Sequence, residues 1–371
     1  MDTNKKDSLA LFRAFPELAR KLDWLPLANL PTPVQQMNLL AEELDEDDLF
    51  IKRDDLSGEV YGGNKVRKLE FLLGEARARG ADSVMTFGTA GSNHCLATAI
   101  YARSLGMEAI SILSPQTNSA SVGRNLLMGF HVGAELHHYH SEPAAQRGAA
   151  WQSARRLGAG KKAPHIIRRG GSSSLGTVGF VNAGLELAEQ IKRGELPEPD
   201  LLYVAMGTMG TAVGLALGLA VANLRTKVVA VRVVDLRYGN EDAFHKLFDS
   251  TATLLNKLDE NFPKLRWVDA NVEFRHEQFG QKYALFTEAG MEAVSLLRST
   301  EGIQLEGTYT GKAMAALIAD SHAGNLEGRR VLFWNTYNSR PFPAEAMNRD
   351  YQKLPFPVQD YFEKPCQALD P

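Results

Sequence analysis

The chain has 371 residues and a net charge of −3 at pH 7; 44% of its residues are hydrophobic and 23% are charged. This length accommodates about two domains of roughly 100–200 residues each, and the composition excludes a disordered or fibrous protein. Lys+Arg (41) and Asp+Glu (44) nearly balance, with no basic stretch, so we expect no nucleic-acid partner.

From about Leu49 onward, short apolar runs alternate with longer segments of helical period, which is typical of an α/β protein with mostly parallel sheets. Valine crowds Lys227–Val234, as expected of a strand covered on both faces. In chain order the predicted elements are strand Leu49–Lys52, helix Lys65–Arg79, strand Ser83–Phe87, helix Ser92–Leu105, strand Glu108–Leu113, helices Ala120–Phe130 and Gly176–Lys192, strand Leu201–Met206, helix Ala212–Asn223, strand Lys227–Val234, helices Glu288–Ser299 and Gly311–Ser321, and strand Arg330–Trp334.

The two cysteines, Cys95 and Cys366, match neither a disulfide framework nor a metal-ligand spacing, which favours a reducing compartment. No apolar run reaches the ~18 residues that a membrane span needs. The polar residues Met1 to Ala10 lack the apolar core of a signal peptide. The sequence therefore predicts a cytoplasmic protein without a metal site or a membrane-spanning segment.

The densest chemical signal is the run Tyr61-Gly62-Gly63-Asn64-Lys65-Val66-Arg67-Lys68-Leu69-Glu70. Two glycines allow an unusual turn or a close approach to a ligand, and a lysine then opens a helix. A helix start carries unpaired N–H groups and a partial positive charge. These features favour a neutral, nucleophilic Lys65. The alternative is a plain loop followed by a solvated helix start.

A second signal follows the apolar run Leu201–Met206 and precedes a small-residue helix. Strand, glycine-rich turn and helix start form the layout of an anion cradle. The spacing fits neither a Walker A loop nor a dinucleotide fingerprint, and an unliganded turn is the alternative. The cradle residues are Gly207, Thr208, Met209, Gly210 and Thr211.

Two further motifs lie at predicted helix starts. In Gly91-Ser92-Asn93-His94, Ser92 or Asn93 can cap the helix, and the same N–H groups can bind a substrate carboxylate. Glu306-Gly307-Thr308-Tyr309-Thr310-Gly311-Lys312 places Tyr309 before another helix. A buried core tyrosine is the alternative reading there.

In this order and spacing, the motifs resemble the 1-aminocyclopropane-1-carboxylate deaminase and D-cysteine desulfhydrase family. That family belongs to the tryptophan-synthase-β-like enzymes that use pyridoxal 5'-phosphate (PLP), known as fold type II. The resemblance runs from about Pro31 to Phe333. Its specific stretches are IKRDDL at Ile51–Leu56, GGNKVRKLEFLL at Gly62–Leu73, GSNH at Gly91–His94, GGSSSLGTVGFV at Gly170–Val181 and YTGKAMAAL at Tyr309–Leu317.

The resemblance implies a role for each matching residue. Lys65 would bind PLP covalently and move the Cα proton, and Asn93 would lie beside the cofactor's O3'. Gly207–Thr211 would hold the phosphate. The catalytic residues would be Lys65, Tyr309, Tyr283 and Ser92, and the substrate carboxylate would be bound by Ser92, Asn93 and His94.

The resemblance also implies two three-layer α/β domains with PLP in the cleft between them, and a homodimer. The large domain would comprise residues 1–67 and 171–371, and the small domain residues 68–170. Thr310 occupies the position where deaminase-like members carry a glutamate that protonates the pyridine nitrogen. A neutral hydroxyl there makes PLP a weaker electron sink, which favours β-elimination of a good leaving group as in desulfhydrases.

Three departures from the family pattern concern the substrate more than the cofactor. Gly91 occupies a position where the family usually has glutamine, and Glu306-Gly307-Thr308 occupies positions where it usually has Asp-Pro-Val. Residues 335–341 replace a Gly-Gly-x-Pro loop, and the bulky Tyr337 is expected to reshape the substrate pocket.

Three hypotheses follow for a small amino-acid substrate. They are a D-cysteine desulfhydrase-like lyase, a deaminase or ammonia-lyase of the same fold, and a PLP-binding protein with little turnover.

Overall fold

The computed structural model describes Lys6 and residues 8–370 in two compact units. The first unit contains residues up to Phe71 together with Ser172–Arg340, and the second contains Leu72–Gly171 and the segment from Pro341 onward. Most of the N-terminal stretch in which no signal peptide was expected lies outside the described residues.

A mostly parallel sheet forms the middle of the first unit. Six strands of the described chain make it, in the order β1-β2-β10-β7-β8-β9, and only β1 runs antiparallel to its neighbour. The strands are β1 (Val34–Gln36), β2 (Leu49–Lys52), β7 (Leu201–Met206), β8 (Lys227–Arg232), β9 (Val272–Arg275) and β10 (Val331–Trp334).

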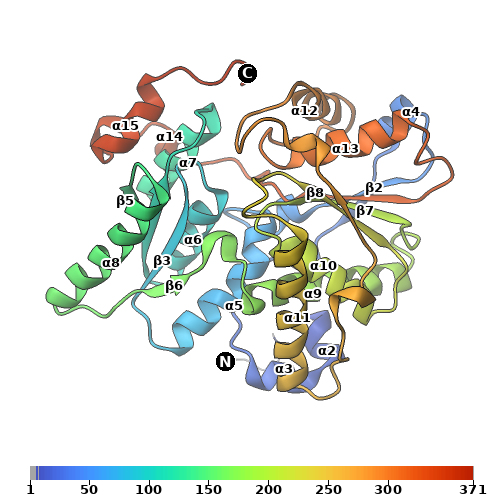
Figure 1. Cartoon of the computed structure of the whole chain (residues 1–371), viewed down its shortest axis with the longest axis horizontal. Coiled ribbons are helices and arrows are strands. Elements are labelled where there is room, and N and C mark those ends of the chain that lie inside the picture. Colours follow the sequence, from blue (N-terminus) through green and yellow to red (C-terminus); the bar gives the residue numbers. More distant parts are fainter. Residues whose placement is uncertain (1–5, 7, 371) are drawn as a thin grey trace. The chain divides into compact units, whose positions relative to one another are not determined.

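Helices cover both faces of this sheet (Figure 1). Side chains alternate along β7, so that Leu202 and Val204 pack on one core and Leu201 and Tyr203 on the other. The longer helices on the first face are α9 (Ser174–Lys192), α10 (Gly210–Val221) and α11 (Glu241–Leu258), with α2 (Ala10–Ala14) and α3 (Pro16–Lys21); those on the second are α4 (Asn38–Leu44), α12 (Glu288–Glu301) and α13 (Thr310–His322). This arrangement gives the three expected layers.

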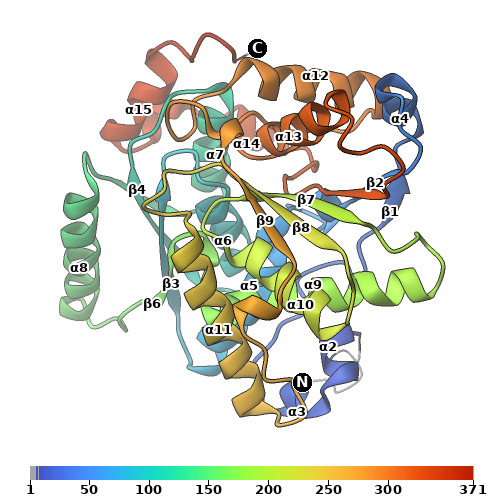
Figure 2. The same ribbon diagram turned by 45° about the vertical axis from the view of Figure 1, so that its right-hand side comes forward.

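The second unit contains a fully parallel sheet of order β5-β4-β3-β6 within the described residues. Helix α8 lies on one face of it and α6 on the other (Figure 2). The elements are β3 (Ser83–Thr89), α6 (Asn93–Ser104), β4 (Glu108–Ser114), α7 (Ala120–His131), β5 (Glu135–His138), α8 (Glu142–Gly158), β6 (His165–Ile167), α14 (Ala344–Met347) and α15 (Phe356–Glu363). Helix α5 (Asn64–Ala78) runs from the first unit into the second.

The α/β architecture with mostly parallel sheets is confirmed. The segment from Pro341 onward, which we expected in the large domain, groups instead with the second unit. The physical reason is a set of hydrogen bonds to the loop after β4, among them Asn118 Nδ2 to the main-chain oxygens of Tyr361 (3.2 Å) and Lys364 (2.9 Å).

Neither a helix able to cross a membrane nor a His/Cys/Asp/Glu cluster able to hold a metal ion is present among residues 6 and 8–370.

Candidate active site

Lys65 is the second residue of α5 and follows a tight glycine turn. Gly63 has φ = 87°, and a Cβ built on it would lie 2.8 Å from the oxygen of Thr336. Only glycine fits this conformation and this contact. The loop of residues 335–341, which contains Thr336, holds the turn by two hydrogen bonds. Asn64 N–H donates to Thr336 O (3.1 Å), and Gly62 N–H donates to Asn338 Oδ1 (2.6 Å). The loop that departs from the family pattern therefore positions the start of the lysine-bearing helix.

The electrostatic surroundings of Lys65 favour a nucleophilic amine. Burial lowers its pKa to about 8, and the nearby Glu306 carboxylate limits this fall. A lysine with a pKa near 8 has a sizeable neutral fraction under physiological conditions, and the neutral amine is the form that attacks a carbonyl group.

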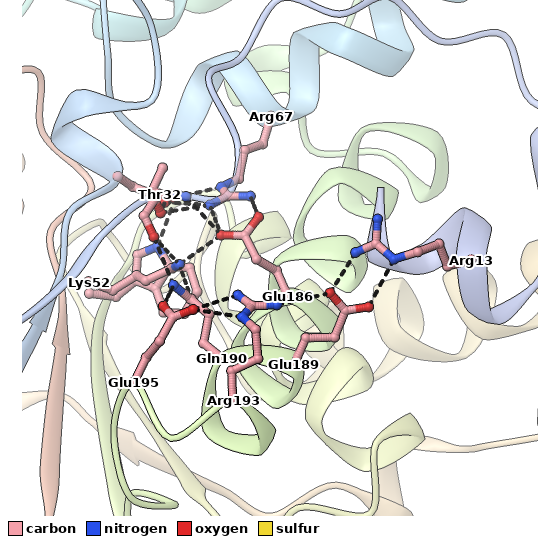
Figure 3. Close-up of polar contacts among 11 residues, drawn as sticks. Arg13, Thr32, Lys52, Arg67, Glu186, Glu189, Gln190, Arg193 and Glu195 are labelled. Carbon is pink, nitrogen blue, oxygen red and sulfur yellow. Dashed lines mark hydrogen bonds and ion pairs between the residues drawn. The ribbon is translucent and has the colours of Figure 1, made fainter. Parts of the chain in front are cut away.

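A buried ionic network anchors α5 two residues further along (Figure 3). The Arg67 guanidinium binds Asp54 at 2.7 and 2.9 Å and binds both carboxylate oxygens of Glu186 at 2.9 Å. Lys52 Nζ also donates to Glu186, at 2.7 Å. Two cations and two anions therefore balance in a site from which water is excluded. The IKRDDL motif, which supplies Lys52 and Asp54, helps to fix the helix that carries Lys65.

The five cradle residues comprise the strained turn after β7, Gly207–Met209, and the first two residues of α10. Met209 adopts φ = 65°, which is rare for a residue with a side chain. Strain of this kind is concentrated at ligand-binding sites. Thr208 Oγ1 lies 2.8 Å from Ser172 Oγ, and Thr211 Oγ1 accepts from Asn64 Nδ2 at 2.9 Å. The turn is thus held by Asn64, the residue before Lys65, and by Ser172, both of the first unit.

Polar side chains closely surround Gly210. A Cβ built there would lie 2.8 Å from Ser172 Oγ, 3.0 Å from Lys68 Nζ and 3.2 Å from Thr177 Oγ1. Thr177 Oγ1 is buried and has no hydrogen-bond partner within the described part of the chain. One ammonium, two hydroxyls and the start of a 12-residue helix converge here, and these donors fit the phosphate of PLP.

Lys68 and Ser172 were not among the predicted site residues. Lys68 Nζ lies 3.3 Å from Ser172 Oγ, and burial, reinforced by the nearby Lys65, lowers the pKa of Lys68 well below its usual value. A phosphate would offset that burial. The signal was present in the sequence, because Lys68 follows Lys65 by three residues and so lies on the same face of the helix.

The two predicted tyrosines come together. The hydroxyls of Tyr283 and Tyr309 are hydrogen-bonded to each other, and a Cβ built on Gly207 would lie 3.5 Å from the Tyr309 ring. Tyr309 therefore lies over the cradle turn. Ala284, next to Tyr283, has φ = 60° and is a second strained position beside the candidate site.

Thr310 is buried at the start of α13, where its hydroxyl bonds the main chain of Glu306. Thr310 Oγ1 accepts from Glu306 N–H at 3.0 Å. The Glu306 carboxylate accepts from the N–H groups of Thr308 (2.8 Å), Tyr309 (2.7 Å) and Thr310 (3.1 Å). Thr310 is thus the first residue of α13 and not its cap, because the N–H groups at the helix start donate to the Glu306 carboxylate. The contact of Thr310 with the cofactor nitrogen stays a prediction. Glu306 was noticed in the sequence only as a departure from the family pattern.

The second unit carries the GSNH motif at the start of α6. Ser92 caps the helix, with its Oγ accepting from Cys95 N–H at 3.2 Å. Asn93 Oδ1 accepts from Asn125 Nδ2 at 2.9 Å, so the oxygen of the Asn93 amide is engaged within the second unit. The N–H groups of Asn93 and His94 have no acceptor inside the helix, as at any helix start.

Two details of this motif differ from the simplest reading. The His94 side chain is only 2% exposed, with Nε2 2.9 Å from Thr86 Oγ1, so any substrate contact of His94 would be through its main chain. Gly91 leaves no room for a larger residue, because a Cβ there would lie 2.9 Å from Gln116 Nε2. Gln116 thus fills the space beside the position where the family carries glutamine.

Residues 25–336 match the family model of pyridoxal-phosphate dependent enzymes, and the chain belongs to this family. PLP dependence and enzymatic function, both implied by the sequence resemblance, are thereby confirmed.

The chain is 34% identical over 304 residues to the D-cysteine desulfhydrase of Serratia proteamaculans, covering 79% of this chain and 87% of that protein. It is also 34% identical over 333 residues to a putative 1-aminocyclopropane-1-carboxylate deaminase of Pyrococcus abyssi, covering 88% and 93%. The crystal structure of a 1-aminocyclopropane-1-carboxylate deaminase homologue superposes with a TM-score of 0.74 at 32% identity, over 88% of this chain and 95% of the other. A fungal L-serine ammonia-lyase from Rhizomucor miehei (TM-score 0.60, 19% identity, covering 91% of this chain and 99% of that one) shares the fold. The chain is a PLP-dependent enzyme of the D-cysteine desulfhydrase and 1-aminocyclopropane-1-carboxylate deaminase group.

Proposed function

We propose that this enzyme catalyses β-elimination of a small amino acid with a thiol leaving group. D-cysteine and water would give pyruvate, ammonia and sulfide: the Cα–H and Cβ–S bonds break, and water replaces the amino group. The observation that carries the proposal is Thr310, a buried neutral hydroxyl at the start of α13. The carboxylate nearest along the chain, Glu306, is already engaged by three main-chain N–H groups.

When bound, PLP withdraws electrons from the substrate Cα and so makes its proton acidic. A neutral hydroxyl beside the pyridine nitrogen, the role proposed for Thr310, would not hold that nitrogen protonated. Carbanion stabilisation would then be modest, which suits departure of a thiolate better than opening of a cyclopropane ring.

The chain's own residues divide the remaining work. The Lys65 amine would take the α-proton, since its lowered pKa makes it a base near neutral pH. The hydrogen-bonded Tyr283 and Tyr309 would supply a proton to the departing sulfur. The start of α6, with Ser92 and Asn93, would bind the substrate carboxylate.

A ring-opening deaminase is the second candidate, favoured by the equal identity to the Pyrococcus relative named as a putative deaminase. Following the resemblance, we also propose a cytoplasmic homodimer.

A substrate panel separates these activities. We expect sulfide and pyruvate from D-cysteine, pyruvate from a β-chloro analogue, and little 2-oxobutyrate from 1-aminocyclopropane-1-carboxylate. Thr310→Glu should alter the visible spectrum of bound PLP and slow β-elimination, whereas Thr253→Glu, on the exposed surface of α11, serves as the matched control. Efficient turnover of the cyclopropane substrate with none of D-cysteine would refute the argument from Thr310. Intact PLP binding with no turnover of any substrate would favour a binding protein.

A further inference from the structure

The segment from Pro341 onward lies beyond the part of the chain that matches the family model, which ends at residue 336. Its helices α14 and α15 pack beside α7 in the second unit (Figure 1). A Cβ built on Gly123 of α7 would lie 3.2 Å from the Phe362 ring, and Gln367 N–H donates to Asn118 O at 3.1 Å. This segment therefore packs at a defined position in the unit that carries the GSNH motif.

A chain of hydrogen bonds connects this C-terminal segment to the GSNH loop. The Tyr361 hydroxyl accepts from Gln116 N–H at 3.2 Å. Gln116 Oε1 in turn accepts from Gly91 N–H at 2.9 Å. On the other side of the same residue, Asn125 Nδ2 donates to Gly91 O at 2.9 Å. Both polar groups of the Gly91 main chain are thus held by side chains that follow α6 in sequence.

The packing around Gly91 leaves little freedom. A Cβ there would lie 2.8 Å from Val122 Cγ2 and 2.9 Å from Gln116 Nε2, so the loop is closely surrounded. The Tyr361 ring is fixed in turn by an edge-on contact with the His138 ring, with centroids 5.8 Å apart. Because Gly91 immediately precedes Ser92 and Asn93, a shift of its main chain moves the start of α6.

We propose that Tyr361 and Gln116 are positioning residues, through which the C-terminal segment sets the geometry of the substrate-carboxylate loop Gly91–Asn93. The proposal rests on the proposed function, in which the start of α6 binds the substrate carboxylate. Its consequence is that an element outside the matched family region tunes substrate affinity without touching the substrate.

The test uses the full-length holoenzyme with Tyr361→Phe and Gln116→Ala, and Tyr351→Phe as the matched control. Tyr351 belongs to the same C-terminal segment and its ring stacks on Phe362, with centroids 4.9 Å apart. Gln116→Ala removes the hydrogen bond from Gly91 N–H, and Tyr361→Phe removes the one from Gln116 N–H together with a longer contact to His138 Nε2 (3.4 Å). Loss of one neutral hydrogen bond corresponds to about a twofold to tenfold change in affinity. We expect Tyr361→Phe and Gln116→Ala, which we call the relay variants, each to raise KM for D-cysteine by that factor while kcat changes less than twofold. Gln116→Asn, which keeps the amide, should recover part of the loss.

A second readout does not depend on activity. Hydrogen–deuterium exchange of the peptide containing residues 89–96 should accelerate in Tyr361→Phe and Gln116→Ala and stay at the wild-type rate in Tyr351→Phe. Unchanged exchange in the two relay variants would overturn the proposal. Accelerated exchange with unchanged KM would also overturn it, since the loop would then not govern substrate binding. If the wild-type enzyme accepts no amino acid, the proposed function fails. If wild type turns over D-cysteine and the relay variants have the same KM as wild type, only the positioning role is refuted.

Discussion

The buried ionic network beside Lys65 gives the sharpest stability prediction. Glu186→Gln keeps the size of the side chain but removes one of the two anions that face Arg67 and Lys52. Burial alone would raise the pKa of Glu186, yet the two cations bring it down to about 2 from the usual 4.5. At 1.36 kcal/mol per pH unit, this difference corresponds to about 3 kcal/mol. Removal of one partner of a buried pair costs about 3–5 kcal/mol in other proteins.

The matched control is Glu189→Gln, one turn along α9 in the same figure (Figure 3). Glu189 pairs with Arg13 at the surface, with side-chain exposures of 35% and 43%, against 6% and 0% for Glu186 and Arg67. Exposed pairs contribute about 0–1 kcal/mol. Urea unfolding should therefore shift to lower denaturant by roughly 1–3 M for Glu186→Gln and hardly at all for Glu189→Gln.

The same network fixes the sign of an acid effect. The folded-state pKa of Glu186 lies below the value in the unfolded chain, so its stabilisation is complete above about pH 4.5 and is lost as the pH falls towards 2. This loss should be present in wild type and absent in Glu186→Gln. Equal effects of the two substitutions at pH 7 would refute the reasoning from burial.

Three further outcomes are expected. Burial raises the pKa of Glu70 to about 8, so wild-type stability should fall as pH rises from about 4.5 to 8. In urea unfolding at pH 9, Glu70→Gln should be more stable than wild type. Parallel stability–pH profiles of the two proteins would contradict this. Gly210→Ala should weaken PLP affinity at least about tenfold, because its methyl group would displace Ser172 Oγ and Lys68 Nζ from the cradle. Gly158→Ala, whose Cβ meets nothing within 4 Å, should bind PLP like wild type in a fluorescence titration. Lys68→Gln should weaken PLP binding roughly tenfold to 150-fold by the loss of one charged hydrogen bond, and wild-type affinity would exclude Lys68 from the cradle.

Much of the fold was predictable because buried parallel strands leave a strong local signal. Strands β2 and β7 have the predicted limits; β7 is a continuous apolar run, and β2 is apolar up to its last residue, Lys52. Strands β6 and β9 were missed because they are short or only half-buried, so their sequences resemble loops. Helix α11 was also missed, although Asn240 caps it and Phe244 and Phe248 mark its buried face.

The site was predictable where one motif carries all the chemistry. The Gly207–Thr211 turn and the start of α5 at Lys65 are local features of strand, glycine and helix order. Ser172 could not be assigned to the cradle, because it reaches Lys68 from 104 residues away in sequence. The contact of Tyr361 with Gln116 spans 245 residues and follows only from the packing of the second unit.

Covalent attachment of PLP to Lys65 is the central claim, and one measurement tests it most directly. Borohydride reduction of the holoenzyme, followed by digestion and mass spectrometry, fixes and locates the lysine bonded to the cofactor. We predict that the modified peptide contains Lys65, and that Lys65→Ala retains no cofactor after reduction and denaturation. A label on Lys68 or on any other lysine, with Lys65 unmodified, would contradict the account.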